Sequence, residues 1–178
     1  MGKKLVDYTD CQEEILRAFK ESRVLLVSQV KQGSPNVMAI GWGLIGRLWN
    51  RPFFMVAVRP SRYTYEFIEK TDDFTVNVPK RGMEEIVDFC GSVSGREHDK
   101  FREKGLVLTP GRKVNSPIIA NCIIHYECKV SYKTRLIHSR LPKDILTSSY
   151  PSRNFHTLYF GEILAAYANE YVRDNLPI

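Results

Sequence analysis

The chain has 178 residues, 43% of them hydrophobic, and 26 Lys and Arg against 20 Asp and Glu give a net charge of +6. This length suits one core, so we expect residues 1–178 to form a single domain. The composition excludes intrinsic disorder and collagen-like structure. The positive balance favours anionic ligands or partners without naming one.

The N-terminus and the cysteines predict a cytoplasmic protein without a membrane partner. No apolar stretch approaches the roughly 20 residues of a membrane helix. The start, 1–7, lacks a hydrophobic signal region, and Val6 stands where a myristoylation signal requires Ser or Thr. No Cys-x-x-Cys pair occurs, so we interpret all cysteines as reduced thiols: Cys11, Cys90, Cys122 and Cys128.

The first elements in chain order are a helix and a hairpin. Apolar spacing predicts an amphipathic helix over 10–22, capped by Asp10. We expect its polar face to be solvated, with Glu13, Glu14, Arg17 and Lys20. The β-branched run 24–30 and the run 36–42 flank a turn cluster at 32–35, which indicates two strands joined by a hairpin.

A loop, a strand, a helix and a further strand follow. We expect a Trp-bearing loop over 46–52 and a strand over 53–58. Helical spacing then predicts a helix over 62–70 with Ser61 at its N-cap. The run 74–78 predicts the next strand.

The second half adds short helices and two long strands. We expect helices over 84–90 and 94–104, the second opened by a capping box of Ser94 and Glu97. The runs 122–132 and 155–167 alternate with period two, which favours a closed or strongly curled sheet. The predicted fold class is mainly β (α+β), a mostly antiparallel sheet with peripheral helices.

The segment around 59–64 has the features of a phosphate site. A strand ends there, and the first helical turn offers free backbone N–H groups beside Arg59, Arg62 and hydroxyl side chains. An arginine can hold phosphate oxygens in bidentate fashion. The alternative is a plain Ser61 cap with two surface arginines.

Two further segments could contribute to a site. Ser94, Arg96 and Lys100 surround a second predicted helix start, although capped structure alone would explain this segment. The strand over 36–43 carries Met38, Trp42 and two glycines, which would allow the backbone to approach a flat ligand. A core strand with a bulge is the alternative there.

The histidines give weaker signals. His156 has no nucleophile nearby in the sequence, so by itself it is typical of a structural, hydrogen-bonded residue. His125 and Glu127 share one strand face but supply no third metal ligand, and we expect no metal site. Hydrolase and Walker-type motifs are missing from the sequence.

Most of the positive charge lies between residues 129 and 153. Six basic residues and one acid, Asp144, give this segment +5: Lys129, Lys133, Arg135, Arg140, Lys143 and Arg153. The range 137–154 has little periodicity, so it reads as a mobile basic flap or as a solvated loop.

Five blocks in order resemble the flavin reductase-like, FMN-binding split-barrel family, and its flavoredoxin branch in particular. The resemblance spans about residues 20–167. The blocks are Asn36–Trp42, Val58–Thr64, Phe74–Pro79, Ser94–Phe101 and His156–Ile163.

The resemblance implies a Greek-key split β-barrel that forms a homodimer and binds FMN. The strand expected along the flavin ring comprises Asn36, Val37, Met38, Ala39, Ile40 and Trp42. The residues expected at the phosphate are Arg59, Ser61, Arg62, Thr64, Ser94, Arg96 and Lys100. His156 is the catalytic candidate, expected near the flavin edge or a nicotinamide pocket. Ala39 departs from the family pattern, which more often has Thr there.

Three functions stay open from the sequence. The first is an oxidoreductase that accepts hydride from NADH or NADPH and passes electrons to free flavin or an acceptor protein. The second is an FMN electron-transfer protein without direct NAD(P)H activity. The third is a basic module for nucleic acid or another polyanion, with Tyr132 and Tyr150 as stacking residues. We do not expect nucleic acid as the partner, because aromatic residues are sparse among these charges.

Overall fold

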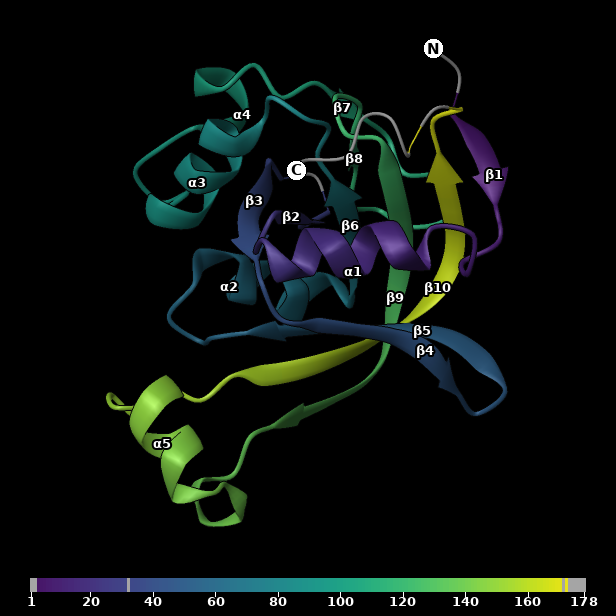
Figure 1. The fold of residues 1–178 in the computed structure, drawn as a ribbon. Helices are drawn as coiled ribbons and strands as arrows, with labels where there is room; N and C mark the ends of the chain where they lie inside the picture. The colour runs from purple at the N-terminus through teal and green to yellow at the C-terminus, as the bar shows by residue number, and fades with distance from the viewer. Residues whose placement is uncertain (1–2, 32, 171, 173–178) are drawn as a thin grey trace.

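An antiparallel, eight-stranded sheet organises the protein in the computed structural model, which describes residues 3–31, 33–170 and 172 (Figure 1). The strands follow the order β3-β2-β6-β9-β10-β5-β4, and β1 pairs with β10. Their bounds are β1 Lys4–Val6, β2 Val24–Gln29, β3 Pro35–Ile40, β4 Gly43–Leu48, β5 Arg51–Val58, β6 Asp73–Val78, β9 Ile124–Arg135 and β10 Thr157–Ala168. A separate ladder joins β7 (Leu108–Thr109) to β8 (Ile118–Ile119).

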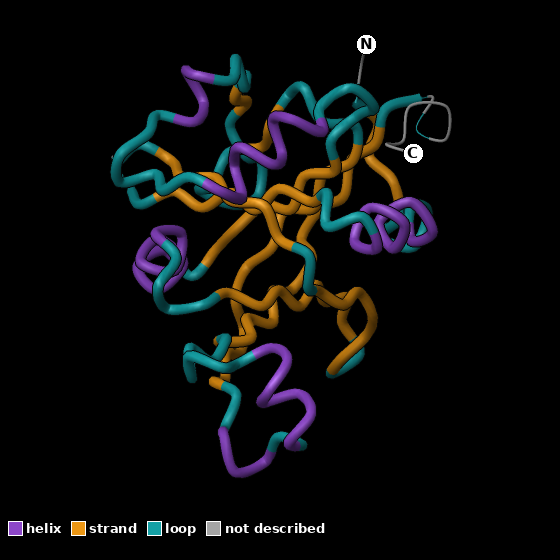
Figure 2. Tube along the Cα trace, turned by 60° about the vertical axis from the view of Figure 1, so that its left-hand side comes forward, coloured by secondary structure: helices purple, strands orange, loops and turns teal. Residues whose placement is uncertain are grey.

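Short helices surround this sheet, as Figure 2 shows. They are α1 Gln12–Lys20, α2 Tyr63–Thr71, α3 Glu84–Ser92, α4 Lys100–Glu103, the 3-10 helix η1 His138–Arg140 and α5 Lys143–Ser149. In the described part of the chain, no helix has both the length and the apolar character needed to cross a membrane. The predicted mostly antiparallel β architecture with peripheral helices is confirmed.

The sheet curls strongly without closing. Its two edge strands, β3 and β4, are consecutive in the chain and are joined by Gly41 and Trp42. Irregularities in the β9–β10 register, one of them at Phe160/Gly161, help the long strands to bend. A Cβ at Gly161 would lie 2.6 Å from the Phe74 ring, so glycine allows the close approach there. Curling is therefore confirmed, and full closure is not observed.

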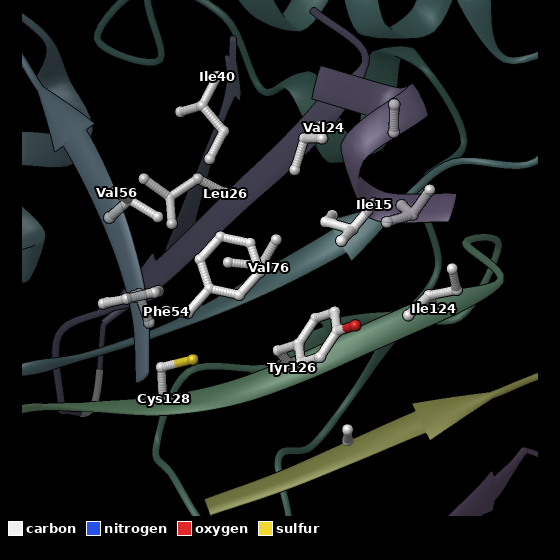
Figure 3. Packing of buried hydrophobic residues seen from close by; sticks show 14 of the residues in the cluster. Ile15, Val24, Leu26, Ile40, Phe54, Val56, Val76, Ile124, Tyr126 and Cys128 are labelled. Atoms are coloured by element: carbon white, nitrogen blue, oxygen red, sulfur yellow. The ribbon is translucent and has the colours of Figure 1, made fainter. Parts of the chain in front are cut away.

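Two hydrophobic clusters use opposite faces of β2. Leu26 belongs to the larger cluster, which α1 covers with Ile15, as Figure 3 shows. Leu25 belongs to the second cluster, where it joins Val87 of α3 and Ile119 of β8. Alternation along the strand explains this division, since successive side chains point to opposite faces. Packing of α3 on β2 and β3 places the end of α3 near the start of α2.

Three helices, predicted over 10–22, 62–70 and 94–104, begin later in the chain than expected. Helix α1 begins at Gln12, and the Asp10 carboxylate instead accepts a hydrogen bond from the Asp7 amide at 2.8 Å. Glu14 is buried rather than solvated, because α1 turns this residue toward the sheet. Arg62, not Ser61, is the N-cap of α2.

The predicted 94–104 helix is reduced to α4, because the Asp99 side chain caps it by accepting from the Arg102 amide at 3.1 Å. Residues 46–52 are not a loop: Trp49 and Asn50, with φ of 49° and 58°, form a two-residue turn between β4 and β5. The 137–154 range also contains regular structure, namely η1 and α5. Its predicted mobility stays a prediction.

Candidate cofactor-binding site

Two neighbouring cavities lie beside β3, one toward the start of α2 and the residues after α3, the other toward the end of β5 and the start of β10. The first, which we call the cationic cavity, has a volume of about 110 Å³ and is lined by Ser61–Thr64, Ser92–Gly95 and Lys100, among others. The second, the aromatic cavity, has about 210 Å³ and is lined by Met38–Trp42, Ala57, Arg59 and His156. Met38 and Arg62 line both cavities, so the two adjoin.

Positive charge without an acidic counterpart defines the cationic cavity. Lys100 is only 4% exposed, and its ammonium donates to the carbonyl oxygens of Val37 at 3.0 Å and Cys90 at 2.8 Å. Burial lowers the pKa of Lys100, because desolvation disfavours the charged form. Arg62 donates a long hydrogen bond of 3.4 Å to the Gly91 carbonyl oxygen. No Asp or Glu is among the residues that line this cavity.

Three hydroxyl groups complete the donor set. The Thr64 oxygen accepts from the Asn36 amide at 2.7 Å, and the Ser61 oxygen accepts from the Asn154 amide at 2.6 Å. The Ser94 oxygen accepts from a backbone amide at 3.2 Å. A hydroxyl that accepts one bond still has its hydrogen to donate. Together with the N-terminus of the nine-residue helix α2, these groups fit a multiply charged anion such as a phosphate.

Gly95 is a site residue that the sequence analysis did not select. A Cβ at this position would lie 1.9 Å from the Asn36 side-chain oxygen, so only glycine lets the two segments meet. The Ser-Gly pair at 94–95 could have indicated a tight turn. The contact of Gly95 with Asn36, however, joins residues far apart in the chain and has no local signal. Ser92 and Val93, which also line the cavity, gave no signal in the sequence.

The aromatic cavity has ring side chains in its lining as well as charge. Five consecutive residues, 38–42, line it, and they belong to the strand predicted over 36–42; that this strand lies along a flat ligand stays a prediction. The Trp42 indole is 47% exposed, and its ring centroid lies 4.6 Å from that of the His156 imidazole. His156 comes from the junction before β10, so tertiary folding brings the two rings together.

His156 is neutral at pH 7. Burial is the main cause that lowers its pKa to about 4, and the nearby guanidinium groups of Arg59 and Arg62 lower it further. Its Nδ1 lies 2.8 Å from the Tyr150 hydroxyl. The sequence gave no signal for Tyr150 at the site, since the contact depends on how the 137–154 segment docks.

Arg59 and Arg96 are not brought into the cationic cavity. Arg59 donates to the carbonyl oxygens of Ser149 and Asn154, each at 2.9 Å, and so anchors the 137–154 segment beside the aromatic cavity. Arg96 forms an ion pair with Glu66 and lies over the Tyr63 ring. It lines a third cavity of about 680 Å³ on the other side of Gly95.

The remaining candidates occupy the interior or separate roles. The Val37 side chain is fully buried in the second hydrophobic cluster, so only its backbone reaches the site. His125 contacts the Asn77 side-chain oxygen at 2.8 Å, and Glu127 accepts from two backbone amides. No group of three His, Cys, Asp or Glu side chains in the described ranges could hold a metal ion. All four cysteines are buried and none forms a disulfide.

Comparisons with known proteins agree on one family. A model of the "Flavin reductase like domain" matches residues 16–176. An uncharacterized protein of Pyrococcus abyssi is 30% identical over 146 residues, which cover 80% of this chain and 72% of that protein.

Three solved structures show the similarity of the fold. A flavoredoxin from Methanosarcina acetivorans is 33% identical, with a TM-score of 0.65 over 83% of this chain and 68% of that one. The flavoredoxin of Desulfovibrio vulgaris is 27% identical, with a TM-score of 0.67 over 87% and 74%. An FMN-binding protein from Thermus thermophilus, at 21% identity, has a TM-score of 0.64 over 84% and 73%.

Proposed function

The chain belongs to the flavin reductase-like family, whose split-barrel fold it shares, and from this premise we propose an FMN-binding oxidoreductase. It accepts hydride from NADH or NADPH and passes the electrons to free flavin or an acceptor protein. The observation that carries the proposal is the pair of adjoining cavities, one lined by cationic and hydroxyl groups and one lined by Trp42 and His156. FMN has a phosphate, which suits the cationic cavity, and a flat ring, which suits the aromatic cavity.

The residues fit this cofactor. Ser61, Arg62, Thr64, Ser94 and Lys100 would hold the phosphate, because each has a hydrogen to donate and no carboxylate is among the described residues that line the cavity. The strand end at 38–42 would lie along the ring. Ala39 offers no hydroxyl there, so backbone groups must supply any hydrogen bonds from this position.

FMN, when bound, supplies the redox chemistry that no side chain can provide. The protein's part is to bind, orient and shield. Arg62 and Lys100 fix the anionic end by charge, whereas Trp42 and His156 wall the flat end and limit the access of water. Neutral His156 can donate a hydrogen bond without adding charge. The cavities contain no paired acid and base, and hydride transfer requires none.

A second candidate is an FMN electron-transfer protein that does not react with NAD(P)H, which the two flavoredoxin structures favour. One experiment separates the candidates. Protein reconstituted with FMN is mixed with NADH or NADPH without oxygen, and the flavin absorbance is followed. Bleaching within seconds supports the oxidoreductase, and stable colour supports the carrier. Protein that retains no FMN after reconstitution contradicts both.

We also propose that the single domain acts as a homodimer. Exposed apolar side chains cluster on the β4–β5 hairpin and the neighbouring strands: Leu44, Leu48, Trp49, Tyr132 and Leu164. Trp49 and Tyr132 contact each other with ring centroids 6.4 Å apart, and β4 is an edge strand. Exposed apolar groups beside an unpaired edge favour association. Light scattering should give a dimer mass for the native protein and a monomer for Trp49→Ser.

None of the four buried cysteines forms a disulfide, which suits a reducing compartment, and we accordingly propose the cytoplasm as the site of action. Fractionation of cells that express the protein would test this: recovery in a secreted or membrane fraction would contradict it.

A further inference from the structure

The 137–154 segment delivers a buried tyrosine to the aromatic cavity. Arg59 anchors the segment through the two carbonyl bonds described above, and its guanidinium carbon lies 5.2 Å from the centroid of the Tyr150 ring. The ring also packs against Phe155 at 4.9 Å and against the edge of Trp42 at 6.3 Å. Tyr150 is 3% exposed. Its hydroxyl is therefore held in one place, next to Nδ1 of His156.

The hydrogen bond between these residues can have two directions. Either the phenol donates to an unprotonated Nδ1, or a protonated Nδ1 donates to the phenol oxygen. In the second case the phenol hydrogen needs another acceptor, and within the described residues the Tyr150 hydroxyl has no hydrogen-bonding partner besides His156. A buried donor without an acceptor is destabilising, because it has lost its hydrogen bond to water. The first direction is therefore favoured.

The charges around both groups support this direction. Burial is the main cause that raises the pKa of Tyr150, so its hydroxyl keeps its hydrogen at pH 7. Arg59 at the end of β5 and Arg62 at the start of α2 both oppose a positive charge on His156. A neutral imidazole with an unprotonated Nδ1 carries its hydrogen on Nε2. No protein partner of Nε2 is found in the described part of the chain.

We propose that Tyr150 is a positioning residue that fixes the His156 tautomer, so that Nε2–H is the ring's free donor at the aromatic cavity. The ligand group that it meets is a hydrogen-bond acceptor, such as a carbonyl or carboxamide oxygen. His156 then acts as a donor and not as a base. If the ligand is NADH or NADPH, the acceptor would be its carboxamide oxygen, and this identification rests on the proposed function. The assignment of the His156 tautomer does not rest on it.

The tautomer can be measured without cofactor or substrate. NMR of protein labelled with ¹⁵N-histidine locates each ring hydrogen, and the His156 signals are identified by their loss in His156→Gln. We expect a hydrogen on Nε2 and none on Nδ1 in the native protein at pH 7. A hydrogen on Nδ1 would overturn the proposal, whatever the outcome of the flavin experiments.

Tyr150→Phe removes the hydroxyl and keeps the ring that packs on Phe155. We expect part of the His156 population to shift its hydrogen to Nδ1, while the control Tyr8→Phe, outside every cavity described, leaves the spectrum unchanged. An unchanged spectrum in Tyr150→Phe would refute the positioning role.

Kinetics provide a second readout if the protein reduces with NAD(P)H. Tyr150→Phe should raise KM for the electron donor about fivefold and change kcat less, as expected for a lost hydrogen bond in ground-state binding. In a His156→Gln background the same substitution should have no further effect, because Gln has no tautomer to fix. Equal effects in both backgrounds would contradict action through His156.

Discussion

The cationic and aromatic cavities adjoin but hold a ligand by different means. The cationic cavity presents fixed charge and hydroxyl donors, and most of them lie in two short segments, 61–64 and 92–95. The aromatic cavity is lined by the end of β3, by His156 and by Arg59. Arg59 in turn donates hydrogen bonds to the 137–154 segment, about 90 residues further along the chain. We therefore expect the affinity for FMN to depend mainly on the groups in 61–64 and 92–95. The reactivity of bound FMN should depend on how the 137–154 segment docks beside the aromatic cavity.

The largest expected effect is the loss of an Arg62 or Lys100 charge. Because a hydrogen bond to a charged group contributes about 1.5–3 kcal/mol, Arg62→Ala or Lys100→Met should weaken FMN binding roughly 10- to 100-fold. Fluorescence titration of FMN measures this. Arg17→Ala, whose arginine pairs with Glu13 on an exposed helix face, is the matched control and should bind as the native protein does.

If Arg62→Ala and Lys100→Met retained native affinity, the phosphate would have to lie outside the cationic cavity.

The next effect comes from Gly95, the glycine that lets the 92–95 segment approach Asn36 of β3. Gly95→Ala places a methyl group onto the Asn36 side chain and so breaks its hydrogen bond to Thr64. We expect a loss of about 1–3 kcal/mol in the free energy of unfolding, together with weaker FMN binding. Urea denaturation gives the first quantity. Gly46→Ala, whose Cβ would meet nothing within 4 Å, serves as the control.

A native stability for Gly95→Ala would show that the Asn36 contact is not needed to shape the cavity.

The next effect is acid destabilisation through two histidines, His156 of the aromatic cavity and His125 of the interior. Burial lowers the folded-state pKa of His156 from 6.5 to about 4 and that of His125 to about 3. The folded chain therefore binds fewer protons than the unfolded chain below pH 6.5. This contribution to stability is complete above pH 6.5 and is lost as the pH falls toward 4. Urea denaturation at several pH values should show this loss, and His156→Gln should reduce it.

A slope between pH 6.5 and 4 that is the same in His156→Gln as in the native protein would mean that this histidine does not contribute.

The smallest effect is expected at Arg59, in contrast to Arg62. Arg59→Met removes two bonds to carbonyl oxygens of the 137–154 segment but no donor from the cationic cavity. We expect faster proteolysis within that segment and an FMN affinity within about threefold of native, less than one average hydrogen bond. A loss of FMN affinity as large as that expected for Arg62→Ala would show that Arg59 binds the phosphate, as its place in the sequence predicts.

The sequence by itself determined much of this protein. Period-two runs located the long strands β9 and β10, and turn residues located the β2–β3 hairpin, because these signals are local. Blocks of matching residues indicated the family. The helix start at 59–64 and the strand at 36–42 were selected as candidate site segments for the same reason: charge, caps and glycines act on neighbouring backbone.

Only the tertiary structure decided which of these groups meet. Arg59 and Arg62 look alike in the sequence, yet one bonds the 137–154 segment and the other lines the cationic cavity. Tyr150 is only six residues before His156, yet it is held against that ring by Arg59, which comes from a distant part of the chain. Gly95 is needed because α3 packs on β3 and brings Gly95 against Asn36. Such contacts depend on the packing of elements distant in the chain, and packing leaves no periodic trace in the residues that it joins.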